Sequence, residues 1–169
     1  MPSNPVQDRG TTMFNNHSGR GELFEAATGL TALTLTVGII RAVLTNPSNS
    51  GRNVIVTNVR LGNTVATIQS VTLRFNTSTT PANSVTPWNR LAVNGVGSQS
   101  TFTYDASSSG LSGGTVGPTY GIYGTGLTTV VDAYSPIVLQ PGVSLGLSSS
   151  GFGLTANAEC LMNWIETAV

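Results

Sequence analysis

Catalytic chemistry in this chain would have to come from a few scattered side chains. Cys160 is the only cysteine and His17 the only histidine, and they lie near opposite ends of the chain. A thiolate nucleophile needs a base beside it, so this pair would require the N-terminal segment to enter the domain. Cys160 shares one face of a predicted strand with Ala158 and Met162, so we instead expect it to be a small core residue. A single cysteine forms no internal disulfide, so packing must stabilise the fold.

The acidic residues offer no clearer catalytic arrangement. Asp105 and Asp132 are candidates for general acid–base catalysis, but both stand beside turn signals, where Asp commonly bonds its own backbone. Glu159 and Glu166 occupy odd and even positions of one predicted strand, so they point to opposite faces. The chain has no lysine and no Gly-x-Ser-x-Gly motif, and residues 124–126 lack the lysine of a phosphate loop. We therefore expect no enzyme, no cofactor and no metal site.

Aromatic residues near predicted loops suggest a binding site as an alternative. Sugar-binding sites use ring faces together with hydroxyl or amide partners, but the same rings also fill cores and subunit interfaces. Residues 105–126 are rich in glycine, and we expect them to project as a long loop or to form an irregular hairpin. Tyr104, Tyr120 and Tyr123 belong to this projecting stretch. The aromatic residues concerned are Trp88, Tyr104, Tyr120, Tyr123 and Tyr134.

The composition suits a protein that functions within an assembly, and the alternative is a plain β-sandwich with a hydroxyl-rich surface. The 169 residues fit one domain, and only 8% are charged, against about 25% in ordinary soluble proteins. The net charge is zero, and the seven arginines are scattered between Arg9 and Arg90. Nucleic-acid binding would need a basic stripe, and a membrane span would need about 18 consecutive apolar residues. We expect neither partner.

Short segments of alternating polarity predict an all-β fold. Candidate strands cover residues 31–44, 52–61, 64–75, 99–104 and 127–131, and residues 91–93 are a further short candidate. Turn signals separate them, such as the run of Asn, Pro, Ser and Gly at 46–51. Eight to ten strands spaced about 8–12 residues apart favour a single antiparallel jelly roll or β-sandwich.

The last thirty residues, 137–166, give the clearest pattern. They predict a short apolar strand stopped at the Pro-Gly pair 141–142, a second strand, and a long closing strand. In the closing strand Cys160, Met162 and Trp164 share one face. Leu161 and Ile165 interrupt the polar pattern of the other face, so we expect a partner subunit to cover them.

Residues 1–29 differ from the rest and predict an extended N-terminal arm, followed by the β-domain at 30–169. The arm is polar, is punctuated by glycine and holds most of the dense charge, although a short helical turn at 22–27 is an alternative. We expect it to lie on another chain, or else to pack back along its own domain. The candidate subunit or capsid contacts are Arg9, Phe14, Arg20, Leu23, Phe24, Leu161 and Ile165.

The C-terminal pattern resembles that of jelly-roll structural proteins of tailed bacteriophages. An apolar strand, the Pro141-Gly142 turn, the Ser144-Leu145-Gly146-Leu147 strand and a closing strand ending Trp164-Ile165-Glu166 carry the resemblance. The chain looks like a capsid cement (decoration) protein or a related small virion component. The resemblance covers about thirty residues in detail and supplies no catalytic residues.

The resemblance implies a binding role on the outside of a virion. Proteins of this kind commonly form homotrimers that bridge major capsid subunits, and an arm adds reach by strand addition. The partners expected on this basis are the major capsid protein and further copies of the chain, at the capsid surface after synthesis in the host cytoplasm. The alternative is a receptor- or glycan-binding jelly roll of a phage tail or spike, with residues 105–126 as the reading surface.

Overall fold

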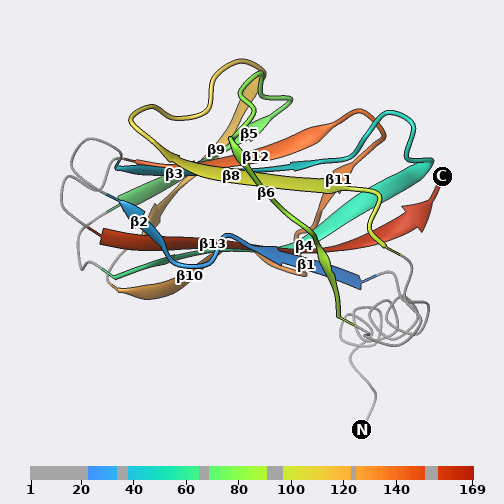
Figure 1. The fold of residues 1–169 in the computed structure, drawn as a ribbon. Coiled ribbons are helices and arrows are strands. Elements are labelled where there is room, and N and C mark those ends of the chain that lie inside the picture. Colours follow the sequence, from blue (N-terminus) through green and yellow to red (C-terminus); the bar gives the residue numbers. More distant parts are fainter. Residues whose placement is uncertain (1–22, 34–37, 65–68, 91–96, 123–124, 151–155) are drawn as a thin grey trace, which may run out of the picture.

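The computed structural model describes residues 23–33, 38–64, 69–90, 97–122, 125–150 and 156–169. These residues form an all-β fold in which two antiparallel sheets pack face to face as a sandwich (Figure 1). The predicted fold class is confirmed. The thirteen strands in the described residues exceed the predicted eight to ten, because several are only two or three residues long. Strands this short are too brief to show a periodic sequence pattern.

Sheet A contains seven strands and sheet B contains six. The strands of sheet A are β1 (Leu23–Ala27), β2 (Thr31–Leu33), β4 (Arg52–Asn63), β7 (Trp88–Asn89), β10 (Gly126–Val131), β11 (Ile137–Leu139) and β13 (Ala156–Ala168). The strands of sheet B are β3 (Ile39–Thr45), β5 (Gln69–Phe75), β6 (Asn83–Val85), β8 (Thr101–Ser107), β9 (Thr115–Ile122) and β12 (Ser144–Ser149).

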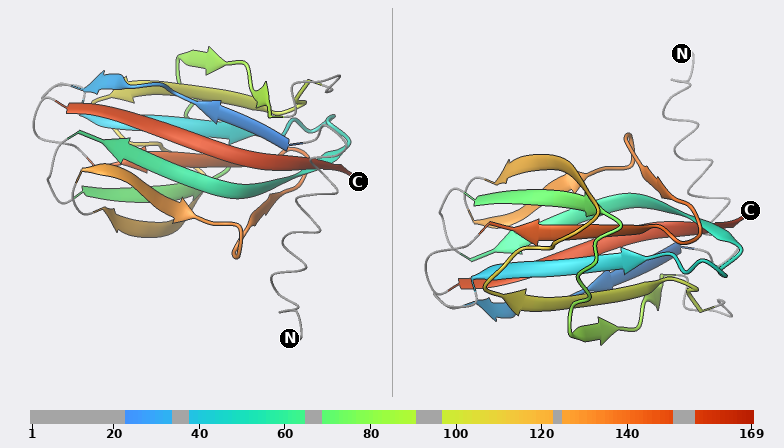
Figure 2. Two further views of the ribbon diagram at one scale, coloured as in Figure 1. Left: turned by 90° about the horizontal axis from the view of Figure 1, so that it is seen from below. Right: turned by 90° about the horizontal axis from the view of Figure 1, so that it is seen from above.

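The strand order is that of a jelly roll. Sheet A runs β10-β4-β13-β1-β7, and sheet B runs β6-β8-β3-β12-β5-β9. The chain crosses repeatedly from one sheet to the other, so that strands close in sequence are seldom neighbours within a sheet. This interleaving is how a double-sheet jelly roll limits its free edges. Figure 2 shows the two outer faces, with β13 and β4 central in one view and β12 and β3 in the other.

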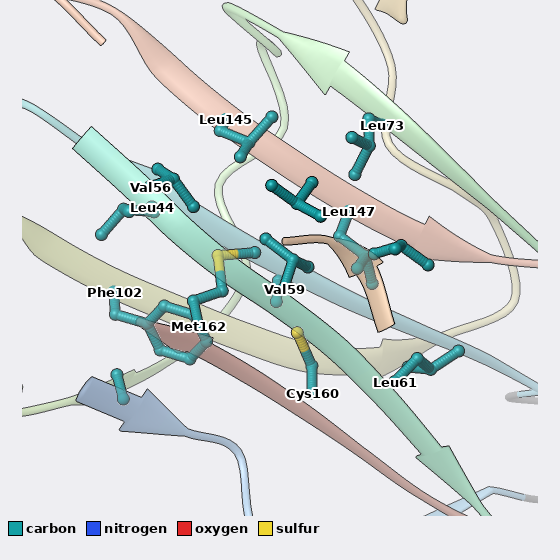
Figure 3. Packing of buried hydrophobic residues seen from close by; sticks show 14 of the residues in the cluster. Leu44, Val56, Val59, Leu61, Leu73, Phe102, Leu145, Leu147, Cys160 and Met162 are labelled. Carbon is teal, nitrogen blue, oxygen red and sulfur yellow. The ribbon is translucent and has the colours of Figure 1, made fainter. Parts of the chain in front are cut away.

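The core lies between the two sheets and is supplied by alternate residues of the long strands. Met162 and Cys160 from β13 face Leu145 and Leu147 from β12 across the sandwich, and all four side chains are fully buried (Figure 3). The predicted inward face of the closing strand is thereby confirmed. Burial of apolar surface of this kind supplies the main stabilisation of such a domain.

An irregularity in β4 keeps both of its halves facing the core. Asn163 pairs with Asn58 and Trp164 pairs with Val56, so Thr57 is an extra residue between them. Before Thr57 the core-facing residues of β4 have even numbers, such as Val56. After Thr57 they have odd numbers, such as Val59. A β-bulge inserts one residue in this way. Without it, one half of β4 would turn its apolar side chains outward.

Two expectations about the chain's organisation are corrected. Residues 23–27 form β1, which pairs with β13 along its whole length, so the predicted arm boundary at residue 29 is too late and the helical alternative at 22–27 is wrong. Residues 105–126 include the end of β8 and all of β9, so the projecting loop is wrong. The hairpin alternative is wrong as well, because β8 pairs with β3 and β6 whereas β9 pairs with β5. The candidate strand at 91–93 and the arm at 1–22 lie outside the described residues.

The Pro-Gly turn predicted at 141–142 is present. Gly142 has a φ of +84°, and the amide of Val143 donates to the carbonyl of Gln140 at 3.0 Å. Positive φ at the third residue of a turn favours glycine, and proline presets the second residue. This turn joins β11 in sheet A to β12 in sheet B.

Candidate functional site

The described residues that were considered for catalysis serve to stabilise the fold. Cys160 is fully buried in the core, where burial and then the charge of Glu159 raise the pKa of its thiol to about 12. A neutral thiol is a poor nucleophile. Its proposed partner His17 lies outside the described residues. Among the residues that the structure describes, no group of three or more His, Cys, Asp or Glu is placed to hold a metal.

The two aspartates are also engaged by their own chain. Asp132 accepts hydrogen bonds from the backbone amides of Tyr134 at 3.0 Å and Ser135 at 3.1 Å, the self-bonded turn expected of it. Asp105 lies within β8 instead of beside a turn. Its two carboxylate oxygens accept hydrogen bonds from Arg41 Nε and Nη2, both at 2.7 Å. This bidentate pair ties β8 to β3 on the outer face of sheet B.

Glu166 is a buried carboxylate that organises one end of the sandwich. It is 0% exposed and accepts hydrogen bonds from the hydroxyls of Ser98 at 2.5 Å and Ser100 at 2.9 Å. The amides of Gln99 and Ser100 and the indole of Trp164 also donate to it. Burial raises the pKa of Glu166, but these hydrogen bonds outweigh burial and lower the pKa below its usual value. The carboxylate therefore fastens residues 98–100 to β13. Glu159 and Glu166 point to opposite faces, as expected.

The described aromatic residues do not gather into one ligand-binding surface. Tyr104 and Tyr120 lie on β8 and β9 and pack against the core, so their assignment to a projecting loop is wrong. Tyr123 lies outside the described residues. Trp88 is 65% exposed and Tyr134 is 79% exposed.

The predicted contact residues separate into two groups. Phe24 is 1% exposed and stacks on Trp164 with ring centroids 6.1 Å apart, so its assignment as a contact is wrong. Leu23, Leu161 and Ile165 lie on the outer face of sheet A, because each alternates with core residues of β1 or β13. The remaining predicted contacts, Arg9, Phe14 and Arg20, lie outside the described residues.

An apolar row crosses the outer face of sheet A. Leu23 pairs with Ile165, Ile165 pairs with Ile55, and Ile55 pairs with Val138. Residues directly opposite on neighbouring strands have Cβ atoms about 5 Å apart, so the four side chains form one continuous line across β1, β13, β4 and β11. Ile165 is 0% exposed, although it is not part of the core cluster. Its side chain is therefore not available to a partner, and the predicted subunit contact at Ile165 is wrong, as it is at Phe24.

More exposed apolar side chains lie elsewhere on the same face. Trp88 pairs with Glu25, two residues along β1 from the row. Leu127 pairs with Gly62 near the other end of β4, where a side chain would meet Leu127 Cδ2 at 3.0 Å. We call Leu23, Ile55, Trp88, Leu127, Val138, Leu161 and Ile165 the apolar face of sheet A. Trp88, Leu127 and Val138 are 65%, 59% and 56% exposed. Val138 continues the apolar row at its exposed end, whereas polar residues such as Arg60 and Asn163 separate Leu127 from it. The row together with Trp88 is therefore the candidate interaction surface.

The outer face of sheet B has the opposite character. Hydroxyl-bearing residues line it, and a cavity of about 380 Å³ opens there between β3, β8, β12 and the turn at 76–80. Sequence reasoning missed this groove. Alternation of threonine at 101 and 103 is a local signal, but the residues that complete the groove come from strands far apart in the sequence.

The chain was compared with known proteins in three ways. No family model matches it, and neither the curated proteins nor the solved structures include a significant match. In the described part of the chain there is no helix of the length and apolarity that crossing a membrane requires.

Proposed function

We propose that this protein is a non-enzymatic structural component of a virion, a cement protein that binds capsid subunits through the apolar face of sheet A. The observation that carries the proposal is the apolar row of Leu23, Ile165, Ile55 and Val138, with the exposed side chain of Trp88 on the neighbouring strand β7. In a strand with one face exposed to solvent, apolar residues that face the core normally alternate with polar residues that face outward. An apolar outer face is typical of a sheet that another protein covers.

The rest of the chain fits such a role. Its charge content of 8% gives little electrostatic repulsion between neighbouring copies. The aspartates and Glu166 are engaged in holding strands and loops in place. The resemblance of residues 137–166 to phage cement proteins supplies the specific setting: homotrimers that bridge major capsid subunits.

The N-terminal segment adjoins this row in the sequence. Residues 1–22 lead directly into Leu23, which is the first member of the apolar row. A segment that starts at this row is well placed to continue the contact onto a capsid subunit or a second copy. Repeated contacts of this kind add through effective concentration, so that each needs only modest affinity.

Localisation in the particle tests the proposal. Electron cryomicroscopy of virions carrying this protein should show a β-sandwich at regular positions on the outside of the head, with sheet A facing the shell. Density restricted to the tail or spike would contradict it and favour the receptor-binding alternative.

A further inference from the structure

We infer that the groove on the outer face of sheet B is a binding site for a neutral saccharide, separate from the apolar face of sheet A. The groove has a volume of about 380 Å³, which lies in the range of small-molecule sites. The polar residues that line it and carry the argument are Thr45, Asn76, Thr80, Thr101, Thr103 and Ser144.

The floor of the groove is built by cross-strand pairing. Thr45 of β3 pairs with Ser144 of β12 on one side and with Thr101 of β8 on the other. In the next row, Val43 pairs with Thr103. Because opposite residues in antiparallel strands lie about 5 Å apart, four hydroxyl groups are arrayed around one apolar side chain.

The hydroxyl groups of the floor are available to a ligand. Ser144 is only 8% exposed and lines the groove. Within the described parts of the chain, neither its hydroxyl nor those of Thr45, Thr101 and Thr103 have a hydrogen-bond partner. These hydroxyl groups open to the groove and are not used within the described chain, so a ligand in the groove can bond to them without breaking a hydrogen bond of the fold.

The wall of the groove is held rigidly against the floor. The amide of Asn76 donates to the carbonyl of Ser144 at 3.0 Å, and the Asn76 side chain accepts from the Ser144 amide at 3.1 Å. The next turn is anchored by Thr77, whose hydroxyl donates to the carbonyl of Ser112 at 2.6 Å. A site that is already formed loses little conformational entropy when its ligand binds.

The chemistry of the lining selects the ligand. None of the described residues that line the groove is charged, so none of them would compensate the charge of a phosphate, a sulfate or a sialic acid. Each hydroxyl both donates and accepts, as the hydroxyls of a sugar do. Val43 is 4% exposed and offers an apolar contact for the C–H face of a sugar ring.

A peptide strand fits the groove less well. Strand addition needs a free sheet edge, whereas the floor strands β3 and β12 each pair on both sides and β8 lies between β3 and β6. A ligand must therefore bind through side chains, and the hydroxyl array matches a saccharide.

Binding to a glycan array tests this inference with the full-length protein. The probes are neutral hexose and N-acetylhexosamine oligosaccharides, with sialylated and sulfated counterparts. We expect a neutral oligosaccharide to bind, and Thr103→Val and Ser144→Ala each to weaken that binding about tenfold or more by removing a hydroxyl. Thr115→Val is the matched control, because Thr115 is an exposed threonine of sheet B outside the groove, and it should bind as the unchanged protein does.

Each other outcome would overturn the inference. These outcomes are binding of no neutral oligosaccharide, preference for the anionic probes, or neutral binding that survives both groove substitutions. Thermal unfolding of each variant confirms that it is folded before its binding is compared. Light scattering provides a second readout: a change in oligomeric state in the groove variants, without glycan binding, would make the groove a protein contact.

Discussion

Leu23 and Ile165 lie directly opposite each other on the neighbouring strands β1 and β13, on the outer face of sheet A. Ile165 is fully buried there, on the side of the sheet that faces away from the core. The pair places the start of the described chain and its last strand side by side. An apolar contact on an outer face, at the point where the N-terminal segment enters the domain, is the basis of the assembly role proposed above.

Replacing Ile165 should destabilise the isolated protein. Ile165→Ala removes a fully buried side chain, and such truncations typically cost about 2–5 kcal/mol. Leu161→Ala, on the same face of the same strand but only half-buried, should cost clearly less. Denaturant unfolding of both variants measures the difference. Equal and small losses would show that Ile165 contributes no packing within the chain.

The carboxylate of Glu166 should make stability depend on pH. Its folded-state pKa is lowered by the hydrogen bonds that it accepts. It therefore stabilises the fold above its unfolded pKa of about 4.3, and this contribution is lost as pH falls through the lower folded pKa. Melting temperatures between pH 7 and pH 3 should fall for the unchanged protein. Glu166→Gln should melt lower at pH 7 and show a flatter pH profile, whereas parallel profiles would contradict this role.

The pair of Arg41 and Asp105 should show strong energetic coupling. Both side chains are largely buried, with 14% and 12% exposed, and two 2.7 Å hydrogen bonds join them. Removing one partner leaves a poorly solvated charge, so Asp105→Ala should cost about 3 kcal/mol. A double-mutant cycle with Arg41→Ala should give a coupling energy of about 1–3 kcal/mol. The exposed pair of Arg90 and Glu25 is the comparison and should couple by less than about 1 kcal/mol.

Cys160 should be inert in the folded protein. Its thiol is fully buried and its pKa is raised to about 12, so the reactive thiolate is scarce and shielded at pH 8. A chromogenic disulfide reagent should label it only after unfolding in denaturant. Rapid stoichiometric labelling of the native protein would show that the core opens at this strand.

Local sequence patterns were sufficient to predict the fold of residues 137–166. The alternation from Ala158 to Trp164 and the Pro141-Gly142 turn are set by neighbouring residues, and both are present in the structure. The short strand β1 was missed because its five residues are stabilised by pairing with β13, and not by any periodicity long enough to recognise.

The groove on sheet B could not be predicted from the sequence, because it depends on pairing between strands that lie far apart in the chain. The pairing of Thr45 with Thr101 and Ser144 depends on how β3 lies between β8 and β12. That placement follows from packing of the whole sandwich, including the extra residue Thr57 in β4, and single-strand patterns do not specify it. Asp105 was misplaced for the same reason, since its partner Arg41 lies on another strand.

The most direct test of the assembly role compares two exposed valines on opposite faces. Val138 on the apolar face of sheet A is 56% exposed, and Val116 on the outer face of sheet B is 57% exposed. Val138→Asp and Val116→Asp are therefore matched in chemistry and exposure and differ in the sheet that carries them. Co-sedimentation with capsid shells that lack the protein measures the shell binding of each variant. The assembly role predicts that the unchanged protein and Val116→Asp bind the shells alike, while Val138→Asp loses most of its binding. Equal binding by all three proteins would contradict the assignment of sheet A as the capsid-binding surface.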